Sequence, residues 1–297
     1  MNQFLPEDKS CLATYMQSPE NNCEVCYGLV KKCDRHHNLL VEYGDFVGII
    51  PREETAIGAD SGKIKEISII SKVGKIVSFV NTGDIFETGG VQYPLLSRKK
   101  AQLLCQAEYI DNLQSGDIID AVITHFESFG AFVDIGCGIV SLLPIDCISV
   151  SRISHPKDRF CEGDKIKVAV TGRDNLGRIT ISHKELLGTW CENAEMFHAG
   201  ETVFGVVRSV ESYGIFVELT PNLAGLAERK EDIVPGDYVS VFIKNILPEK
   251  MKVKLIIIDK IGHDVPPLPS KYFTKDDHID SFYYSPDDCV KQIYRIF

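Results

Sequence analysis

The residues best suited to chemistry are aromatic side chains that occur twice at the same spacing beside a glycine. Phe129 and Phe132 lie in SFGAFVDIG, and Tyr213 and Phe216 take the same places in SYGIFVELT, 84 residues later. Because side chains alternate between the two faces of a strand, Phe132 points outward if Val133 points into a core. Outward aromatic rings can stack on nucleobases, each stack contributing on the order of 1–3 kcal/mol. The spacing therefore predicts two base-stacking surfaces.

A plainer explanation is that these rings cover a barrel end or pack against a neighbouring unit. Packing alone does not require two aromatic residues at the same interval in both copies, although inherited core geometry could preserve them. We therefore favour stacking and keep packing as the alternative.

Each aromatic pair lies within a repeated series of five strand-like segments. A glycine followed by an acidic residue precedes the first segment of each copy, at 116–117 and 200–201, and the fourth, at 163–164 and 236–237. The last segments are RITIS at 178–182 and KVKLIII at 252–258. Five short strands with glycine at the corners are typical of an OB-fold barrel.

A fainter copy precedes both, and the sequence predicts a mostly β protein of three tandem five-stranded OB-fold barrels with short helical linkers. The first barrel lacks the aromatic pair, having His36 and His37 near the place of Phe129 and Leu40 near that of Phe132. The expected parts are an N-terminal segment with this degenerate barrel (1–97), a helical linker (98–114), the second barrel (115–184), a linker with buried Trp190 (185–198), a shorter third barrel (199–258) and a C-terminal extension with a helix starting near Ser285 (259–297).

These motifs resemble the RNA-binding S-one domain of the bacterial small-subunit ribosomal protein S-one, over roughly residues 24–258. The FGAF-type aromatic pair and the glycine-acid pair before the fourth strand carry the resemblance. It implies that Phe129 and Phe132 stack on bases and that Asp174 and Arg178 flank the last turn, where Arg178 contacts phosphate. Pro144 replaces the family's third-strand histidine, for which His155 is a partial substitute.

In the third barrel the resemblance places the aromatic positions on Tyr213 and Phe216 and the arginine position on Lys252. Glu228 stands where the family has histidine, and a carboxylate there repels phosphate unless Arg208 or Lys254 offsets it. The implied RNA-binding residues are Phe129, Phe132, His155, Asp174, Arg178, Arg208, Tyr213, Phe216 and Lys252.

The missing pair in the first barrel is similar to the family's amino-terminal domains, which dock on the ribosome. This similarity implies docking on the small subunit, and simple capping of the array is the other interpretation.

Charge and composition leave competing functions open. The net charge of −10 is unusual for a nucleic-acid binder, because phosphate contacts usually require a basic surface. A protein-binding adaptor on the ribosome or an RNA-processing complex is therefore the alternative to an RNA binder. We expect no cofactor and no catalysis, since GxxxxGK[ST], GxSxG and HExxH are absent.

The cysteines favour a reduced, cytoplasmic protein without metal. Cys23, Cys26 and Cys33, followed by His36 and His37, suggest a zinc site and, at lower rank, a zinc-dependent enzyme. On a continuous strand Cys23 and Cys26 would face opposite sides, so we expect neither. The ten cysteines are scattered, and no apolar segment approaches the roughly 20 residues of a membrane span.

Overall fold

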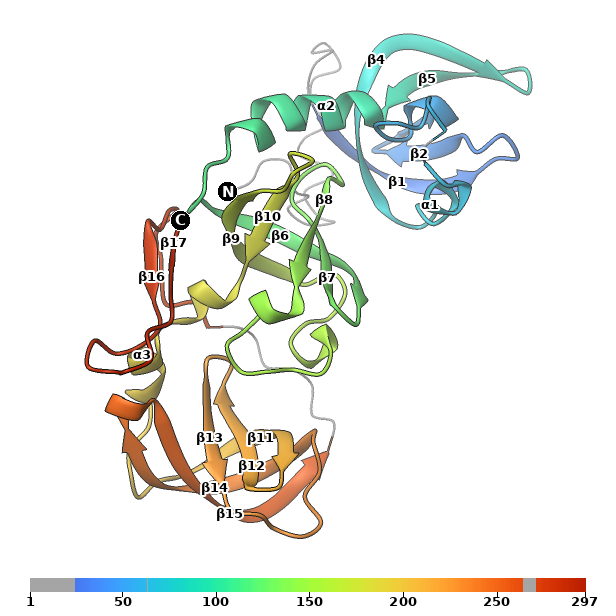
Figure 1. Ribbon diagram of the computed structural model, residues 1–297. Helices are drawn as coiled ribbons and strands as arrows, with labels where there is room; N and C mark the ends of the chain where they lie inside the picture. The colour runs from blue at the N-terminus through green and yellow to red at the C-terminus, as the bar shows by residue number, and fades with distance from the viewer. Residues whose placement is uncertain (1–24, 63, 264–270) are drawn as a thin grey trace. The chain divides into compact units, whose positions relative to one another are not determined.

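The computed structural model describes residues 25–62, 64–263 and 271–297 (Figure 1). The chain divides into two units. The first holds the described residues up to Leu113 together with Asp134–Val140, and the second holds Gln114–Val133 with Ser141–Phe297. Each unit is described by itself.

The first unit contains a closed five-stranded barrel in the order β1-β2-β3-β5-β4. Val30, Val41, Phe79 and Leu96 fill its interior. A helix, α2 (Arg98–Glu108), follows the last strand, where the sequence predicted one, and Ser97 caps it by accepting a hydrogen bond from the Lys100 backbone N–H at 2.8 Å. The barrel elements are β1 (Cys26–Cys33), β2 (Leu39–Tyr43), β3 (Phe46–Ile50), α1 (Glu66–Ile70), β4 (Ile76–Thr88) and β5 (Val91–Ser97).

The second unit begins with a five-stranded sheet in the order β10-β9-β6-β7-β8. This is the circular order of the first barrel, opened between β8 and β10, which share no backbone ladder over these described residues. Ser141 on β8 bridges that seam by donating its hydroxyl to the Ile179 carbonyl on β10 at 2.8 Å. The strands are β6 (Ile118–Glu127), β7 (Gly130–Asp134), β8 (Val140–Pro144), β9 (Lys165–Arg173) and β10 (Ile179–Ser182).

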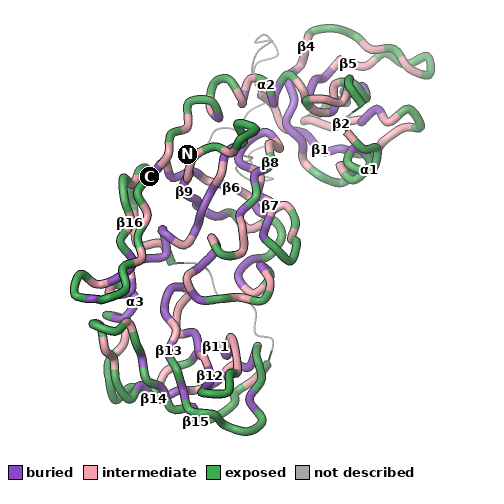
Figure 2. The backbone as a smooth tube through the Cα atoms, viewed as in Figure 1, coloured by how far each residue is buried: buried purple, intermediate pink, exposed green. Residues whose placement is uncertain are grey.

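The third sheet is again a closed barrel, in the order β11-β12-β13-β15-β14. Its buried core includes Val207, Val217, Val239 and Leu255, and Figure 2 shows buried residues recurring along the strands. The predicted fold class of tandem five-stranded OB-fold sheets is therefore confirmed. The strands are β11 (Thr202–Glu211), β12 (Gly214–Thr220), β13 (Leu223–Ala227), β14 (Asp237–Leu247) and β15 (Lys252–His263). The last strand runs beyond the predicted end at 258, because residues 259–263 still pair with β14.

The segment between the second and third barrels has little helix. It holds a 3₁₀ turn (Lys184–Leu187) and α3 (Trp190–Ala194), which starts with a capping box between Thr189 and Glu192. Trp190 is 2% exposed and belongs to the core of the third barrel, so its predicted burial is confirmed.

A buried ion pair joins the second barrel to the third. The Arg159 guanidinium, in the loop before β9, makes a bidentate contact with the Glu218 carboxylate on β12, and Arg208 binds the same carboxylate at 2.8 and 3.1 Å. Burial opposes ionisation of Glu218, but the two arginines outweigh it and lower its pKa. Nearby, the Val150 and Ser151 backbone N–H groups donate to Asn222 and Pro221 at 3.0 Å.

The predicted C-terminal helix does not form. Residues 281–296 contain a two-stranded hairpin, β16 (Ser281–Tyr283) with β17 (Tyr294–Ile296). Ser285, expected as a helix cap, accepts instead from the Ile293 backbone N–H across the hairpin at 2.9 Å. The buried Tyr284 donates its hydroxyl to the Asn222 carbonyl at 2.6 Å, whereas Val290 is fully exposed. Anchoring of Tyr284 in the third barrel therefore outweighs the local helix signals.

A buried hydrogen-bond chain holds the C-terminal segment on the second barrel. The Lys167 backbone N–H donates to the Tyr272 hydroxyl at 2.9 Å, and that hydroxyl lies 3.3 Å from His183 Nε2. His183 Nδ1 lies 2.8 Å from the Ile148 carbonyl, which can only accept. Nδ1 therefore carries the proton and Nε2 accepts from Tyr272. Burial lowers the pKa of His183 to about 4.

This buried histidine predicts a loss of stability on mild acidification. The unfolded chain binds a proton near pH 6.5, but the folded protein resists it until about pH 4. The stability contributed above pH 6.5 is therefore lost as the pH falls toward 4, by about 3 kcal/mol in all. Urea unfolding at pH 7 and 5, followed by the fluorescence of the single tryptophan, should show a smaller pH effect in His183→Gln. His198→Gln, at a side chain 76% exposed, is the control, and an equal pH effect in all three proteins would contradict the assignment.

Candidate nucleic-acid interface

The two aromatic pairs have the same geometry in the second and third barrels. The Phe129 and Phe132 ring centroids lie 6.1 Å apart at an interplanar angle of 83°, and those of Tyr213 and Phe216 lie 6.1 Å apart at 88°. Phe129 is 54% exposed and Tyr213 is 68% exposed, while their partners on β7 and β12 are half-buried. Each pair thus presents one open ring and one ring seated on the sheet, and we call them the two platforms.

Glycine sets the position of each platform. A Cβ on Gly130 would lie 2.5 Å from the Leu143 carbonyl oxygen, and one on Gly214 would lie 2.6 Å from that of Ala227. Only glycine lets the start of β7 or β12 approach the neighbouring strand this closely. The tight turn before each strand places the exposed ring beside the half-buried one.

His125 extends the platform of the second barrel. Its ring lies flat on Phe132, with centroids 4.4 Å apart and an angle of 7°. Simple strand alternation from the buried Ile123 would turn His125 inward, so no local pattern indicated this contact. In β11 of the third barrel the register shifts between Val207 and Ser209, and such a bulge reverses which face the next residue occupies. Ser209, at the place of His125, pairs with Phe216 and adds no ring there.

Strand pairing places a cation in line with the third-barrel platform. Phe216 on β12 pairs with Leu226 on β13, and Leu226 pairs with Lys254 on β15, so the three lie in one row across strands about 4.8 Å apart. Lys252 is exposed on the same side of β15. Leu226 is 38% exposed and gives the row an apolar centre. The resemblance implied Lys252 as the cation, but the strand pairing puts Lys254 nearer the platform.

Asp174 and Arg178 close the turn between β9 and β10. Arg178 Nε donates to Asp174 Oδ2 at 2.7 Å, and Asp174 Oδ1 accepts from the Leu176 and Arg178 backbone N–H groups at 2.9 Å. The Arg178 side chain remains 71% exposed. β10 adjoins β8 through the Ser141 bridge, and β8 adjoins β7, the strand that carries Phe132.

Two expected site residues lie elsewhere. His155 caps a short 3₁₀ turn (Pro156–Asp158), where its Nδ1 accepts from the Lys157 backbone N–H at 3.2 Å, and its nearest described ring contact is Phe126. Arg208 is only 13% exposed and binds Glu218, so it neutralises a buried carboxylate instead of offsetting Glu228. The structure therefore brings neither side chain to a platform.

Metal ligation finds no support in the described part of the chain. Cys23 lies outside the described residues, and Cys26 and Cys33 lie on β1. No group of three or more His, Cys, Asp or Glu suited to a metal ion occurs among the described residues. No helix in those ranges is long and apolar enough to cross a membrane.

Comparison with known proteins identifies the family of the second barrel. The model of the S1 RNA binding domain, the S-one domain, matches residues 112–184. The small ribosomal subunit protein bS1 of Leuconostoc lactis is 33% identical over 178 residues, covering 54% of this chain and 41% of that protein. That of Chlamydia muridarum is 28% identical over 244 residues, covering 75% and 42%. The resemblance indicated by the motifs is confirmed, and the chain spans less than half the length of these relatives.

One solved structure matches over much of the chain. A multidomain protein with nucleic acid binding domains from Streptococcus pneumoniae has a TM-score of 0.26 and 12% identity, covering 80% of this chain and 74% of that one.

The Asp174–Arg178 contact predicts an acidic carboxyl group at the turn. The Arg178 side chain, with the backbone N–H groups of the turn, lowers the pKa of Asp174 below its usual range. We expect Arg178→Gln to raise the Asp174 pKa toward the ordinary value, measured by carbon-13 NMR titration of the carboxyl resonance. Arg173→Gln, in the same turn, is the matched control. An Asp174 pKa unchanged by Arg178→Gln would show that the ion pair does not persist in solution.

Proposed function

We propose, from the membership of residues 112–184 in the S1 RNA-binding domain family, that this chain is a non-catalytic protein that binds single-stranded RNA on its two platforms. The observation that carries the proposal is the repeated aromatic pair. Its two rings are the same distance apart in both barrels and lie at nearly the same interplanar angle. The exposure of Phe129 and Tyr213 favours stacking over packing, since a ring that only covered a core would be buried.

Each barrel supplies a cation beside its platform. Arg178 serves the second barrel, and Lys252 and Lys254 serve the third, in reach of phosphates whose bases stack on Phe132 or Phe216. Sequence preference is weak, because every base has a face that can stack. RNA binding by the platforms requires no cofactor.

The acidic character of the chain limits the electrostatic part of binding. About three phosphate contacts release few counterions, so log K falls with log salt at a slope of about −2. Stacking, which depends little on salt, therefore supplies most of the affinity.

Kinship with bS1 supports a role in translation, in the cytoplasm, with the small ribosomal subunit as a partner. The first barrel is the suited docking element, because His36, His37 and Leu40 stand where the other barrels have platforms.

Loss of the rings should weaken RNA binding. Fluorescence anisotropy with a labelled, unstructured RNA of about twenty nucleotides should give at least a thirty-fold weaker affinity for Phe129→Ala/Phe132→Ala, from about 1 kcal/mol or more per stack. Tyr213→Ala/Phe216→Ala should also weaken binding. Phe46→Ala, at a ring 63% exposed in the first barrel, is the control. Equal affinity of the platform variants and wild type would leave a protein-binding adaptor as the better account.

Docking should be independent of the platforms. The full chain and its variant with all four platform rings replaced by alanine should cosediment equally with small ribosomal subunits in the presence of excess competitor RNA. If the full chain does not cosediment, docking is wrong. If the full chain cosediments and the variant does not, the chain reaches the ribosome through RNA.

A further inference from the structure

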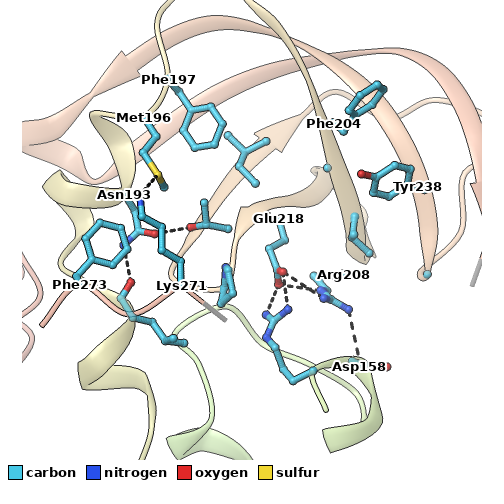
Figure 3. A pocket seen from close by; sticks show the side chains of 18 of the residues that line it. Asp158, Asn193, Met196, Phe197, Phe204, Arg208, Glu218, Tyr238, Lys271 and Phe273 are labelled. Atoms are coloured by element: carbon cyan, nitrogen blue, oxygen red, sulfur yellow. Dashed lines mark hydrogen bonds and ion pairs between the residues drawn. The ribbon is translucent and has the colours of Figure 1, made fainter. Parts of the chain in front are cut away.

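A pocket of about 710 Å³ lies in the second unit (Figure 3), and none of the four platform rings is among its lining residues. Its walls come from the loop at 157–159, the segment 187–197, strands β11, β12 and β14 of the third barrel, and Lys271 and Phe273. Pockets for small molecules are about 300–1,000 Å³, so the volume suits one nucleotide-sized ligand. The third-barrel platform shares β12 with the pocket but uses other residues, because β12 gives Phe216 to the platform and Glu218, Leu219 and Thr220 to the pocket.

Two stacked rings form one wall of this pocket. Phe204 on β11 and Tyr238 on β14 have centroids 5.7 Å apart at 19°, and Phe204 is 60% exposed. The exposed ring of Phe204 can stack on the flat ring of a ligand.

The second barrel shows that barrel geometry does not require this wall. Repeat alignment puts Asp120 at the place of Phe204 and Lys165 at that of Tyr238. On that face of the second barrel, Asp120 forms an ion pair with Lys167 at 3.5 Å. The aromatic wall is therefore particular to the third barrel.

The pocket is cationic in an acidic chain. Its lining holds four basic side chains against two carboxylates, leaving two positive charges; they are Lys157, Arg159, Arg208 and Lys271 against Asp158 and Glu218. Glu218 is occupied by its two arginines, and Arg208 Nη1 is 4.0 Å from Asp158 Oδ2, beyond hydrogen-bond distance. An anion is the charge complement of this lining.

The described contacts of the Lys271 ammonium group are weak ones. Its Nζ lies 3.4 Å from the Met196 sulfur and 4.8 Å from the centre of the Phe273 ring (Figure 3). A thioether is a poor acceptor, so a phosphate oxygen would be a stronger partner for this ammonium group.

We propose that this pocket binds one nucleotide, with its base against Phe204 and Tyr238 and its phosphate at Lys271 and Lys157. The combination of a stacked pair with one exposed ring, Phe204, and a surplus of two positive charges carries the assignment. The ligand is either a free mononucleotide or one nucleotide of an RNA strand, which share this chemistry. None of the four platform rings lines the pocket, so the proposal does not depend on their role.

The first arm of the test uses adenosine 5′-monophosphate, adenosine and inorganic phosphate in NMR titrations of the full chain. Phe204→Ala should weaken binding of the monophosphate at least fivefold, and Phe46→Ala should leave it unchanged. Lys271→Ala should weaken the monophosphate and leave adenosine unaffected, because it removes only the phosphate contact. Matching thermal unfolding curves establish that the variants are folded.

The second arm uses the labelled twenty-nucleotide RNA and the variant that lacks all four platform rings. If Phe204→Ala weakens the remaining RNA binding but no mononucleotide binds, the occupant is part of a strand; loss in the mononucleotide arm alone identifies a free nucleotide. If Phe204→Ala behaves like Phe46→Ala in both arms, the proposal is overturned. Failure of the platform variants to change RNA binding would refute the proposed function and leave the mononucleotide arm able to decide the pocket.

Discussion

The close approach of a glycine to the neighbouring strand is the constraint on which both platforms depend. At Gly130 and Gly214 a side chain would collide with a carbonyl oxygen 2.5 or 2.6 Å away. Because the strands meet so closely there, the preceding turn has little freedom, and its aromatic residue is held beside the ring on the next strand. The same constraint acts in both barrels and gives the same distance of 6.1 Å.

The buried carboxylate of Glu218 joins the second barrel to the third. A single buried carboxylate would be costly, and two arginines from different elements, Arg159 and Arg208, compensate its charge. Removing one partner of such a group leaves an uncompensated buried charge, so the arrangement holds the loop at 157–159 against β12. That loop also forms one side of the pocket, which ties the shape of the pocket to this ion pair.

Charge is distributed unevenly in a chain whose net value is −10. Cations occur at three separate places, with Arg178 exposed at the turn between β9 and β10, Lys254 in line with the third-barrel platform and Lys271 in the pocket. The overall acidity therefore does not describe any of these three places. Aromatic rings accompany the cation at each of them, and a ring with a cation suits a nucleotide better than either alone.

The sequence by itself determined the repeated features. The order of five strands, the two aromatic pairs and the burial of Trp190 follow from local patterns, since alternation and glycine positions act over a few residues. Asp174 and Arg178 came from the family resemblance, and one short turn contains both. The prediction of a C-terminal helix was wrong, since local capping signals could not reveal that Tyr284 is anchored on Asn222.

Only the tertiary structure decided the contacts between distant segments. His125 stacks on Phe132 from the neighbouring strand, and Arg208 on β11 binds Glu218 on β12; neither contact follows from alternation within one strand. The pocket gathers residues from 157 to 273, which no spacing along the chain could associate. Periodicity reports which side of its own strand a residue occupies, whereas its neighbours across space depend on how strands, linkers and loops pack together.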